Sequence, residues 1–220
     1  MRIGCILFDL DGTLVNSRED LVTSVNLTLK EMSRELLAGD LVASFVGEGV
    51  SKLIERALSV SLEQPPVPAE IETGVEIFRR HYRQHLLDQT RPYPDVAETL
   101  SYFHGLPMAV ITNKPADFSL AILEGLGLSH HFRAVLGGDS LPERKPHPAP
   151  LVEAARLCET PIEQCLMVGD SRVDIMAGKA AWMRTCGFTG GFRARSELEE
   201  AGADFLIDRF GELREIVERA

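Results

Sequence analysis

Four polar residues of types that handle phosphate or metal ions stand directly after short apolar runs. They are Asp9, Asp11, Thr112 and Asp170. In open α/β sheets, ligand sites form where the strands end at their carboxyl edge. If these apolar runs are strands of one such sheet, the four residues lie close together. Asp174 follows Asp170 by about one helical turn and would join them.

Carboxylates that converge in this way need a cation. Asp9 and Asp11 are two residues apart, and side chains at that spacing on a strand point the same way. Asp170 would bring a third carboxylate, and three close carboxylates repel one another unless a cation lies among them. Oxygen-only ligands are the set that Mg²⁺ prefers. The pattern therefore predicts a magnesium site.

The same residue types can transfer a phosphoryl group. A carboxylate can attack phosphorus to form an acyl phosphate, and a second carboxylate can protonate the leaving group and then activate water. Thr112 offers a hydroxyl and backbone amides to the phosphoryl oxygens. Lys145 offers a positive charge for the same group.

Each residue also has a simpler interpretation. Residues 9–12 alone fit a tight turn equally well, whereas a calcium loop is excluded because its other acidic ligands are missing. Thr112 alone would merely end a strand, and Lys145 alone would be a solvated surface lysine. Asp170 would cap the helix that follows it. The catalytic interpretation depends on the whole set and its order.

The surrounding elements predict an α/β protein with a parallel sheet. Six apolar runs are expected as strands: 3–8, 108–112, 134–136, 165–168, 184–188 and 205–207. Helical patterns alternate with them after residue 92, which favours a doubly wound, Rossmann-like sheet covered on both faces. The stretch 15–87 shows helical spacing only. We therefore expect a small α-helical cap domain (15–87) inserted into a catalytic core of residues 1–14 and 88–220.

Four ordered segments resemble the four motifs of the haloacid dehalogenase superfamily. They are Asp-Leu-Asp-Gly-Thr-Leu at 9–14, Thr-Asn at 112–113, Lys-Pro at 145–146 and Gly-Asp-Ser-Arg-Val-Asp at 169–174. The resemblance covers nearly the whole chain. It implies a magnesium-dependent phosphatase that works through an aspartyl-phosphate intermediate. The inserted helical domain would close over the substrate and exclude water during the first step.

The resemblance also implies a role for each carboxylate. Asp9 would be the nucleophile and a magnesium ligand. Asp11 would be the general acid/base, with its backbone carbonyl on the metal. Asp170 would complete the metal site, and Asp174 would hold either the metal's shell or Lys145 in place. The presence of Asp11 favours phosphoryl transfer over dehalogenation.

Further residues are implied to bind the substrate. Thr112 and Asn113 would bind the phosphoryl group, and Lys145 would neutralise its charge. Gly47 and Gly49 resemble a glycine-containing cap loop of the superfamily's phosphoglycolate-hydrolysing group, although a helix break explains them equally well. The chain is most similar to that group, which makes 2-phosphoglycolate the first candidate substrate.

Three other functions remain open. The substrate could be another small phosphate, such as a sugar phosphate, a nucleotide or pyrophosphate. A sugar phosphomutase of the same fold would pass the phosphoryl group to a second substrate instead of water. A non-catalytic binding module is the third alternative, and the intact set of charged residues argues against it.

Composition excludes several classes of protein. The chain of 220 residues has a formal net charge of -10 and no Lys/Arg-rich run, so we expect no nucleic-acid partner. Four scattered cysteines, Cys5, Cys158, Cys165 and Cys186, form neither a zinc nor a redox motif. No apolar stretch is long enough for a bilayer, and the N-terminus does not resemble a signal peptide. We expect a cytoplasmic monomer or homodimer whose partner is a small phosphorylated metabolite.

Overall fold

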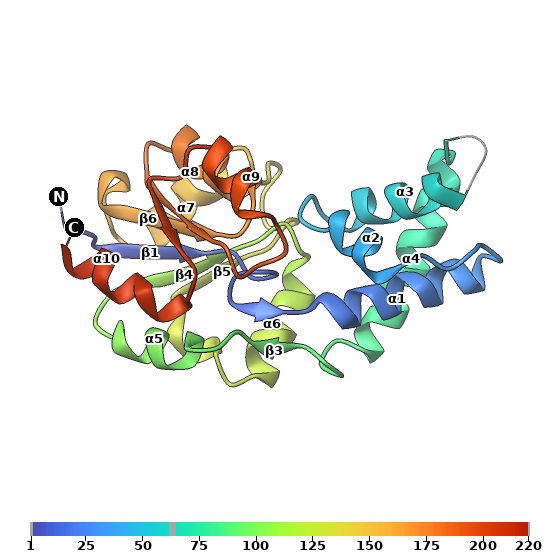
Figure 1. Cartoon of the computed structure of the whole chain (residues 1–220), viewed down its shortest axis with the longest axis horizontal. Helices are drawn as coiled ribbons and strands as arrows, with labels where there is room; N and C mark the ends of the chain where they lie inside the picture. The colour runs from blue at the N-terminus through green and yellow to red at the C-terminus, as the bar shows by residue number, and fades with distance from the viewer. Residues whose placement is uncertain (1, 62–64, 220) are drawn as a thin grey trace. The chain divides into compact units, whose positions relative to one another are not determined.

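Two compact units make up the chain, and the computed structural model describes residues 2–61 and 65–219 of it (Figure 1). We call residues 1–16 and 91–220 the core unit and residues 17–90 the helical unit. The unit boundaries lie two to three residues beyond the expected 14 and 87. The shift arises because Val15–Asn16 (β2) and Arg91–Pro92 (β3) pair as an antiparallel ribbon within the core unit. Residues 1, 62–64 and 220 of the expected domains lie outside the described residues.

A six-stranded parallel sheet forms the centre of the core unit. Its strands are Cys5–Phe8 (β1), Met108–Ile111 (β4), Ala134–Leu136 (β5), Cys165–Gly169 (β6), Arg184–Phe188 (β7) and Phe205–Ile207 (β8). Their order across the sheet is β5-β4-β1-β6-β7-β8. Strand β1 therefore lies between β4 and β6, and the residues that follow these three strands emerge at one place. The predicted α/β fold with a parallel sheet is confirmed.

Helices cover both faces of this sheet, as its sequence requires. Every residue of β1, β4 and β6 is buried, and such continuous apolar strands need cover on each side. The helices of the core unit are Val96–Tyr102 (α5), Ala116–Gly125 (α6), Ala149–Leu157 (α7), Arg172–Ala180 (α8), Arg195–Glu200 (α9) and Leu213–Arg219 (α10), with short 3-10 turns at Ser129–His131 (η1), Ile162–Gln164 (η2) and Phe210–Glu212 (η3). Leu7 packs in a cluster with α7 and α8 on one face. Phe8 points to the other face, where its ring stacks on Phe210 at 5.9 Å.

Within residues 17–61 and 65–90, four helices form the helical unit, as its sequence pattern predicts. They are Arg18–Glu31 (α1), Gly39–Ser44 (α2), Val50–Ser61 (α3) and Pro68–Gln84 (α4). Helix α4 packs against α1 and α3. Its Phe78 and Tyr82 are fully buried, with ring centroids 5.2 Å apart. Burial of two such rings is a large apolar contribution to this small unit.

A buried carboxylate ties the two chain ends of the helical unit together. Asp20, in the first turn of α1, accepts hydrogen bonds from the backbone N–H of Gln89 at 2.9 and 3.1 Å. It also accepts the N–H and the hydroxyl of Thr90, at 2.8 and 2.7 Å. The incoming and outgoing segments of the unit are therefore fixed to each other.

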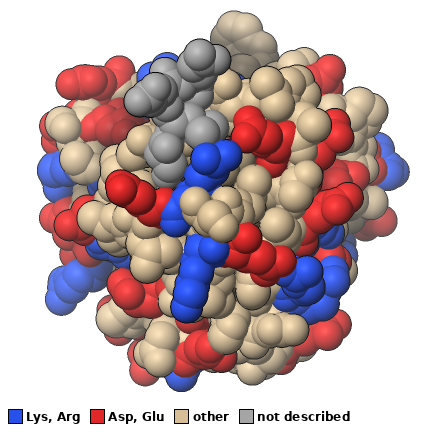
Figure 2. All heavy atoms as spheres, turned by 90° about the vertical axis from the view of Figure 1, so that its right-hand side faces the viewer, with Lys and Arg blue, Asp and Glu red and all other residues tan. Residues whose placement is uncertain are grey.

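Acidic and basic side chains are interspersed on the face of the helical unit shown in Figure 2. Arg80 and His81 of α4 both contact Glu31 of α1, and Arg34 pairs with Glu70 at 3.1 Å. Exposed pairs of this kind each contribute at most about 1 kcal/mol. Within the described residues, none of the helices combines the length and apolar character needed to cross a bilayer.

Candidate active site

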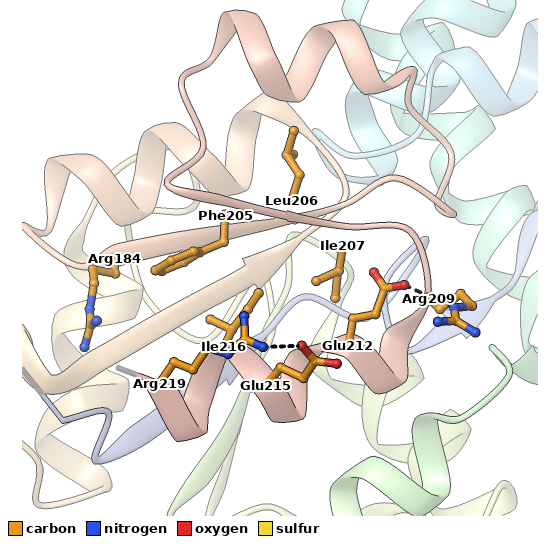
Figure 3. Close-up of a pocket in the computed structure, with 9 residues that line it drawn as sticks. All are labelled: Arg184, Phe205, Leu206, Ile207, Arg209, Glu212, Glu215, Ile216 and Arg219. Atoms are coloured by element: carbon orange, nitrogen blue, oxygen red, sulfur yellow. Dashed lines mark hydrogen bonds and ion pairs between the residues drawn. The ribbon is translucent and has the colours of Figure 1, made fainter.

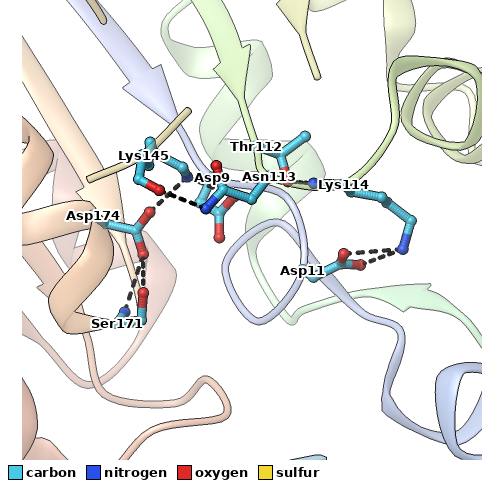
Figure 4. A network of polar contacts seen from close by, with 8 residues as sticks. All are labelled: Asp9, Asp11, Thr112, Asn113, Lys114, Lys145, Ser171 and Asp174. Carbon is cyan, nitrogen blue, oxygen red and sulfur yellow. Dashed lines mark hydrogen bonds and ion pairs between the residues drawn. The ribbon is translucent and has the colours of Figure 1, made fainter. Parts of the chain in front are cut away.

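The loop after β1 places Asp9 and Asp11 at the carboxyl edge of the sheet, next to the end of β6 (Figure 4). The N–H of Asp9 donates to the carbonyl of Val168 at 2.9 Å, so the chain stays paired with β6 up to the first aspartate. Gly12 then takes a left-handed conformation with φ of 84°. A Cβ there would lie 2.3 Å from Asp170 Oδ2. Glycine thus lets this loop approach the third aspartate closely.

Three buried carboxylates converge at this edge and fit a divalent cation. One ligand oxygen from each of Asp9, Asp170 and Asp174 lies within 4.8 Å of the others. All-oxygen donor sets of this kind suit hard cations such as Mg²⁺. The Asp11 side chain is not part of this cluster among the described residues, and its expected metal contact is through its backbone carbonyl. The structure thus brings Asp9, Asp170 and Asp174 together, and their ligation of a metal stays a prediction.

Lys145 bridges two of these carboxylates. Its Nζ lies 2.6 Å from Asp174 Oδ1 and 2.8 Å from Asp9 Oδ1. Burial alone would lower the pKa of Lys145, but the charges of Asp174 and Asp9 outweigh it and hold the pKa above its ordinary value. Lys145 therefore carries a positive charge beside Asp9, which suits the neutralising role expected of it.

Burial dominates the ionisation of Asp9 and Asp170. Burial raises the pKa of Asp9 to about 6, with Asp174 adding repulsion and Lys145 opposing the rise. Burial followed by repulsion from Asp174 and Asp9 also raises the pKa of Asp170 well above its ordinary value. Close carboxylates with raised pKa values gain from a bound cation, because it relieves both desolvation and repulsion.

Both oxygens of Asp174 already have partners within the protein. Oδ1 accepts from Lys145, and Oδ2 accepts the backbone N–H and hydroxyl of Ser171 at 3.1 and 2.7 Å. The second pair of contacts caps the start of α8. Sequence alone left open whether Asp174 holds the metal's shell or Lys145. The structure shows the contact with Lys145.

The strand end of β4 supplies Thr112 and Asn113. Thr112 is 5% exposed, and its Oγ1 accepts the backbone N–H of Lys114 at 3.2 Å. The side-chain amide of Asn113 donates to the carbonyl of Lys145 at 2.8 Å. Asn113 thus fixes the segment that carries Lys145, while its expected substrate contact stays a prediction.

Two contacts of the site were not predicted from the sequence. Lys114 binds both carboxylate oxygens of Asp11, at 3.0 and 2.9 Å. The N–H of Phe192, in the loop after β7, donates to Asp170 Oδ2 at 2.7 Å. A signal existed for each residue, because Lys114 directly follows the Thr-Asn motif, and two glycines at 190–191 follow a predicted strand.

Gly47 and Gly49 lie in the helical unit, in the segment that joins α2 to α3. Both take positive φ angles, 118° and 90°, which side chains disfavour. Between them, Glu48 pairs with Arg56, whose guanidinium also donates to the carbonyl of Phe45 at 3.2 Å. The two glycines thus shape a helix break, and their substrate contact and the role of the helical unit as a cap stay predictions.

A large groove of the core unit lies elsewhere, along β8 and α10 (Figure 3). Its volume is about 670 Å³, and its arginines include Arg209 and Arg219. Arg209 pairs with Glu212 at 3.1 Å and Arg219 with Glu215 at 3.0 Å. None of the motif residues lines this groove. The chemistry of the side chains, rather than cavity size, therefore locates the candidate site.

Comparisons with known proteins agree with this geometry. The family model described as "Haloacid dehalogenase-like hydrolase" matches residues 6–188. A phosphoglycolate phosphatase of Colwellia psychrerythraea is 42% identical over 94% of each chain. One of Neisseria meningitidis is 38% identical over 99% of this chain and 93% of its own length.

A solved structure extends the similarity to the fold. The crystal structure of a predicted phosphoglycolate phosphatase from Haemophilus somnus 129PT has a TM-score of 0.93 and 35% identity, with 98% of each chain covered. The aligned residues include both the core unit and the helical unit of the present chain. The chain therefore belongs to the haloacid dehalogenase-like hydrolases, as its motifs predict, and within that family it is a phosphatase enzyme.

Proposed function

We propose that this enzyme hydrolyses a small phosphate monoester with the help of magnesium, through an aspartyl phosphate on Asp9, and that 2-phosphoglycolate is its substrate. The observation that carries the proposal is the position of Asp9. It directly follows the central strand β1, it is buried beside Asp170 and Asp174, and it contacts Lys145 at 2.8 Å. A carboxylate in that setting can act both as a nucleophile and as a metal ligand.

Asp9 and Asp170 would hold the magnesium ion, with the backbone carbonyl of Asp11. Asp174 is less suited to direct ligation, because its two oxygens already bind Lys145 and Ser171. When bound, the ion would neutralise charge on the carboxylates and on the phosphoryl oxygens. The raised pKa values of Asp9 and Asp170 support a cation at this place.

In the first step, an oxygen of Asp9 attacks phosphorus and the bond from phosphorus to the ester oxygen breaks. Asp11 gives a proton to the departing alcohol. Lys145 and Thr112 bind the phosphoryl oxygens, whose charge is stabilised by the fixed ammonium. The pKa of Asp9, raised by burial to about 6, leaves it mostly ionised at pH 7 and above, as a nucleophile must be.

In the second step, Asp11 takes a proton from water, and the oxygen of that water attacks phosphorus. The acyl-phosphate bond breaks, which returns Asp9 as a carboxylate and releases inorganic phosphate. One carboxylate thus serves as acid and then as base. Asp11 follows Asp9 by two residues on the same loop, and its side chain points toward Lys114 while Asp9 lies beside Lys145 (Figure 4).

The choice of 2-phosphoglycolate rests on relatives of the chain. Curated relatives named phosphoglycolate phosphatase are 33–42% identical over most of the chain. Their similarity includes the helical unit as well as the core unit. Sugar phosphates, nucleotides and pyrophosphate would suit the same phosphoryl-binding residues, so the substrate has to be measured.

Phosphate release from a panel of esters tests the proposal. The panel contains 2-phosphoglycolate, sugar phosphates, nucleoside monophosphates and pyrophosphate, each with Mg²⁺ and with a chelator. We expect 2-phosphoglycolate to be preferred and chelation to stop turnover. Asp9→Asn should lower kcat by at least about 10³-fold, as loss of a nucleophile does.

Asp40→Asn is the matched control, because Asp40 is an exposed aspartate of the helical unit. It should retain wild-type turnover. Substantial activity of Asp9→Asn would contradict the nucleophile, and full activity without a divalent metal would contradict the metal site. Turnover of none of the esters would contradict the proposed hydrolysis and would call for a phosphomutase assay on sugar phosphates.

A further inference from the structure

A second lysine–aspartate pair lies at the same edge of the sheet, separate from the contacts of Lys145. Lys114 Nζ binds Oδ1 and Oδ2 of Asp11, at 3.0 and 2.9 Å (Figure 4). The side chains of Lys114 and Asp11 are only 4% and 11% exposed. Both oxygens of the proposed acid/base are therefore bound to an ammonium group.

This pair is not needed to hold the fold together at that point. The loops that carry Asp11 and Lys114 follow β1 and β4, which are already joined by parallel pairing from Ile6–Met108 to Phe8–Val110. Desolvation of two buried charges also offsets most of their attraction, so such pairs add little net stability. A buried ion pair that adds little net stability and lies at a proposed active site is a candidate for ligand binding.

Lys114 is also closely coupled to the phosphoryl-binding residues. Its backbone N–H donates to Thr112 Oγ1 at 3.2 Å, and the adjacent Asn113 donates to the carbonyl of Lys145. Its ammonium is thus fixed a short distance along one loop from Thr112. A second charged group on a very small phosphate ester would meet this ammonium, whereas a distant group on a large ester would not.

We infer that Lys114 is a specificity-determining residue that recognises a carboxylate on the substrate, and that this carboxylate displaces Asp11 from Lys114. The inference rests on the proposed function and deepens it. The incoming carboxylate has the same planar pair of oxygens as Asp11, so it replaces the bidentate contact one for one. Asp11 is then released from Lys114 and can donate its proton to the ester oxygen.

An ester without a second anionic group lacks this replacement. To use Asp11, it must break the contact with Lys114 and leave the ammonium without its carboxylate partner in a mostly buried position. Losing such a charged partner is unfavourable. The enzyme thus discriminates between the two kinds of ester in two ways. The Lys114–Asp11 contact of the ligand-free site has to be broken, and only a substrate carboxylate replaces it by binding Lys114 directly.

The test compares 2-phosphoglycolate with 2-hydroxyethyl phosphate, which has a neutral hydroxymethyl group in place of the carboxylate. The quantity measured is the ratio of their kcat/KM values. We expect Lys114→Met to lower this ratio about 10- to 150-fold, the range for loss of a hydrogen bond to a charged group. Lys114→Arg should restore most of it, because a guanidinium also binds carboxylates with two N–H groups.

Lys179→Met is the matched control, since Lys179 is an exposed lysine of α8. It should keep the wild-type ratio. A Lys114→Met protein in which both esters lose activity equally would overturn the inference, because a merely structural role predicts that result. Failure of Lys114→Arg to restore the ratio would overturn it as well.

A measurement on the unaltered enzyme covers the case in which Lys114→Met does not fold. Glycolate should inhibit turnover of 2-hydroxyethyl phosphate at lower concentration than its neutral amide, glycolamide, and equal inhibition would overturn the inference. Equal kcat/KM values of the wild-type enzyme for 2-hydroxyethyl phosphate and 2-phosphoglycolate would overturn the inference about Lys114. The proposed phosphatase chemistry would not be affected by that result. Wild-type enzyme that hydrolyses neither ester would refute the proposed function itself.

Discussion

Buried aspartates have different roles in the two units of this molecule. In the helical unit, Asp20 is 2% exposed and accepts four hydrogen bonds from Gln89 and Thr90. In the core unit, Asp9 and Asp170 are also buried, at 8% and 3% exposed, but their neighbours include other carboxylates. Asp20 accepts hydrogen bonds from protein donors alone, whereas Asp9 and Asp170 also lie beside other carboxylates, and Lys145 contacts Asp9.

Burial of a carboxylate does not by itself indicate a functional site. A buried carboxylate with enough N–H and O–H donors stabilises a fold, because its charge is solvated by the protein. Buried carboxylates that face one another raise the free energy of the folded chain, and such an arrangement persists where a ligand or a reaction uses it. Three measurements of stability test this contrast.

Asp20→Ala should lower the free energy of unfolding by about 3 kcal/mol. The substitution removes one acceptor group and leaves the buried N–H and hydroxyl of Thr90 unsatisfied, each at a cost of about 1–3 kcal/mol. Urea unfolding followed by far-UV circular dichroism measures the loss. Glu19→Ala, an exposed neighbour on α1, should change stability by less than about 0.5 kcal/mol. Equal losses in the two variants would show that the Asp20 contacts are not the cause.

Asp170→Asn should have the opposite effect on the metal-free chain and stabilise it at pH 7.5. Burial and repulsion from Asp174 and Asp9 raise the pKa of Asp170, and a neutral amide avoids both penalties. Thermal unfolding with and without Mg²⁺ provides the measurement. The wild-type chain should gain stability from Mg²⁺ according to RT ln(1 + [Mg²⁺]/Kd), and the variant should lose most of that gain.

The control for this prediction is Asp40→Asn, which removes an exposed carboxylate of the helical unit. It should respond to Mg²⁺ like the wild type. A metal-free Asp170→Asn chain that is less stable than the wild type would show that Asp170 is a structural acceptor like Asp20. The N–H of Phe192, which donates to Asp170, would then be the contact that was lost.

Much of the fold was predictable because its signals are local. Continuous apolar runs flanked by polar residues mark the strands, and helical spacing between them marks a doubly wound sheet, as the structure confirms. The β2–β3 ribbon escaped prediction because two-residue strands show no period. The six-residue helix α9 is likewise too short for a helical pattern to stand out.

The sequence motifs predicted which residues form the site, but they did not predict the contacts between these residues. Asp9 and Asp170 follow strands, so their place at the sheet edge could be expected. The contact of Lys145 with Asp174 joins residues 29 apart, and that of Lys114 with Asp11 joins residues 103 apart. Such pairings depend on how loops fold over the sheet edge, which no periodicity in the sequence reports.

The pH dependence of stability should show the effect of burial on Asp9, and this is the smallest effect of the three. Burial raises the pKa of Asp9 from 3.8 to about 6, so between these values the folded chain binds more protons than the unfolded chain. Stability from this group is therefore lost as the pH rises through the window, and most of the loss is complete above pH 7. From pH 5.0 to 7.5 the loss amounts to about 1.4 kcal/mol.

Urea unfolding of the metal-free wild type and of Asp9→Asn at these two pH values measures this loss. The free energy of unfolding of Asp9→Asn relative to that of the wild type should rise by the same amount. A difference that stays constant with pH would mean that burial does not raise the pKa of Asp9, and the electrostatic argument for a cation beside it would then rest on Asp170 alone.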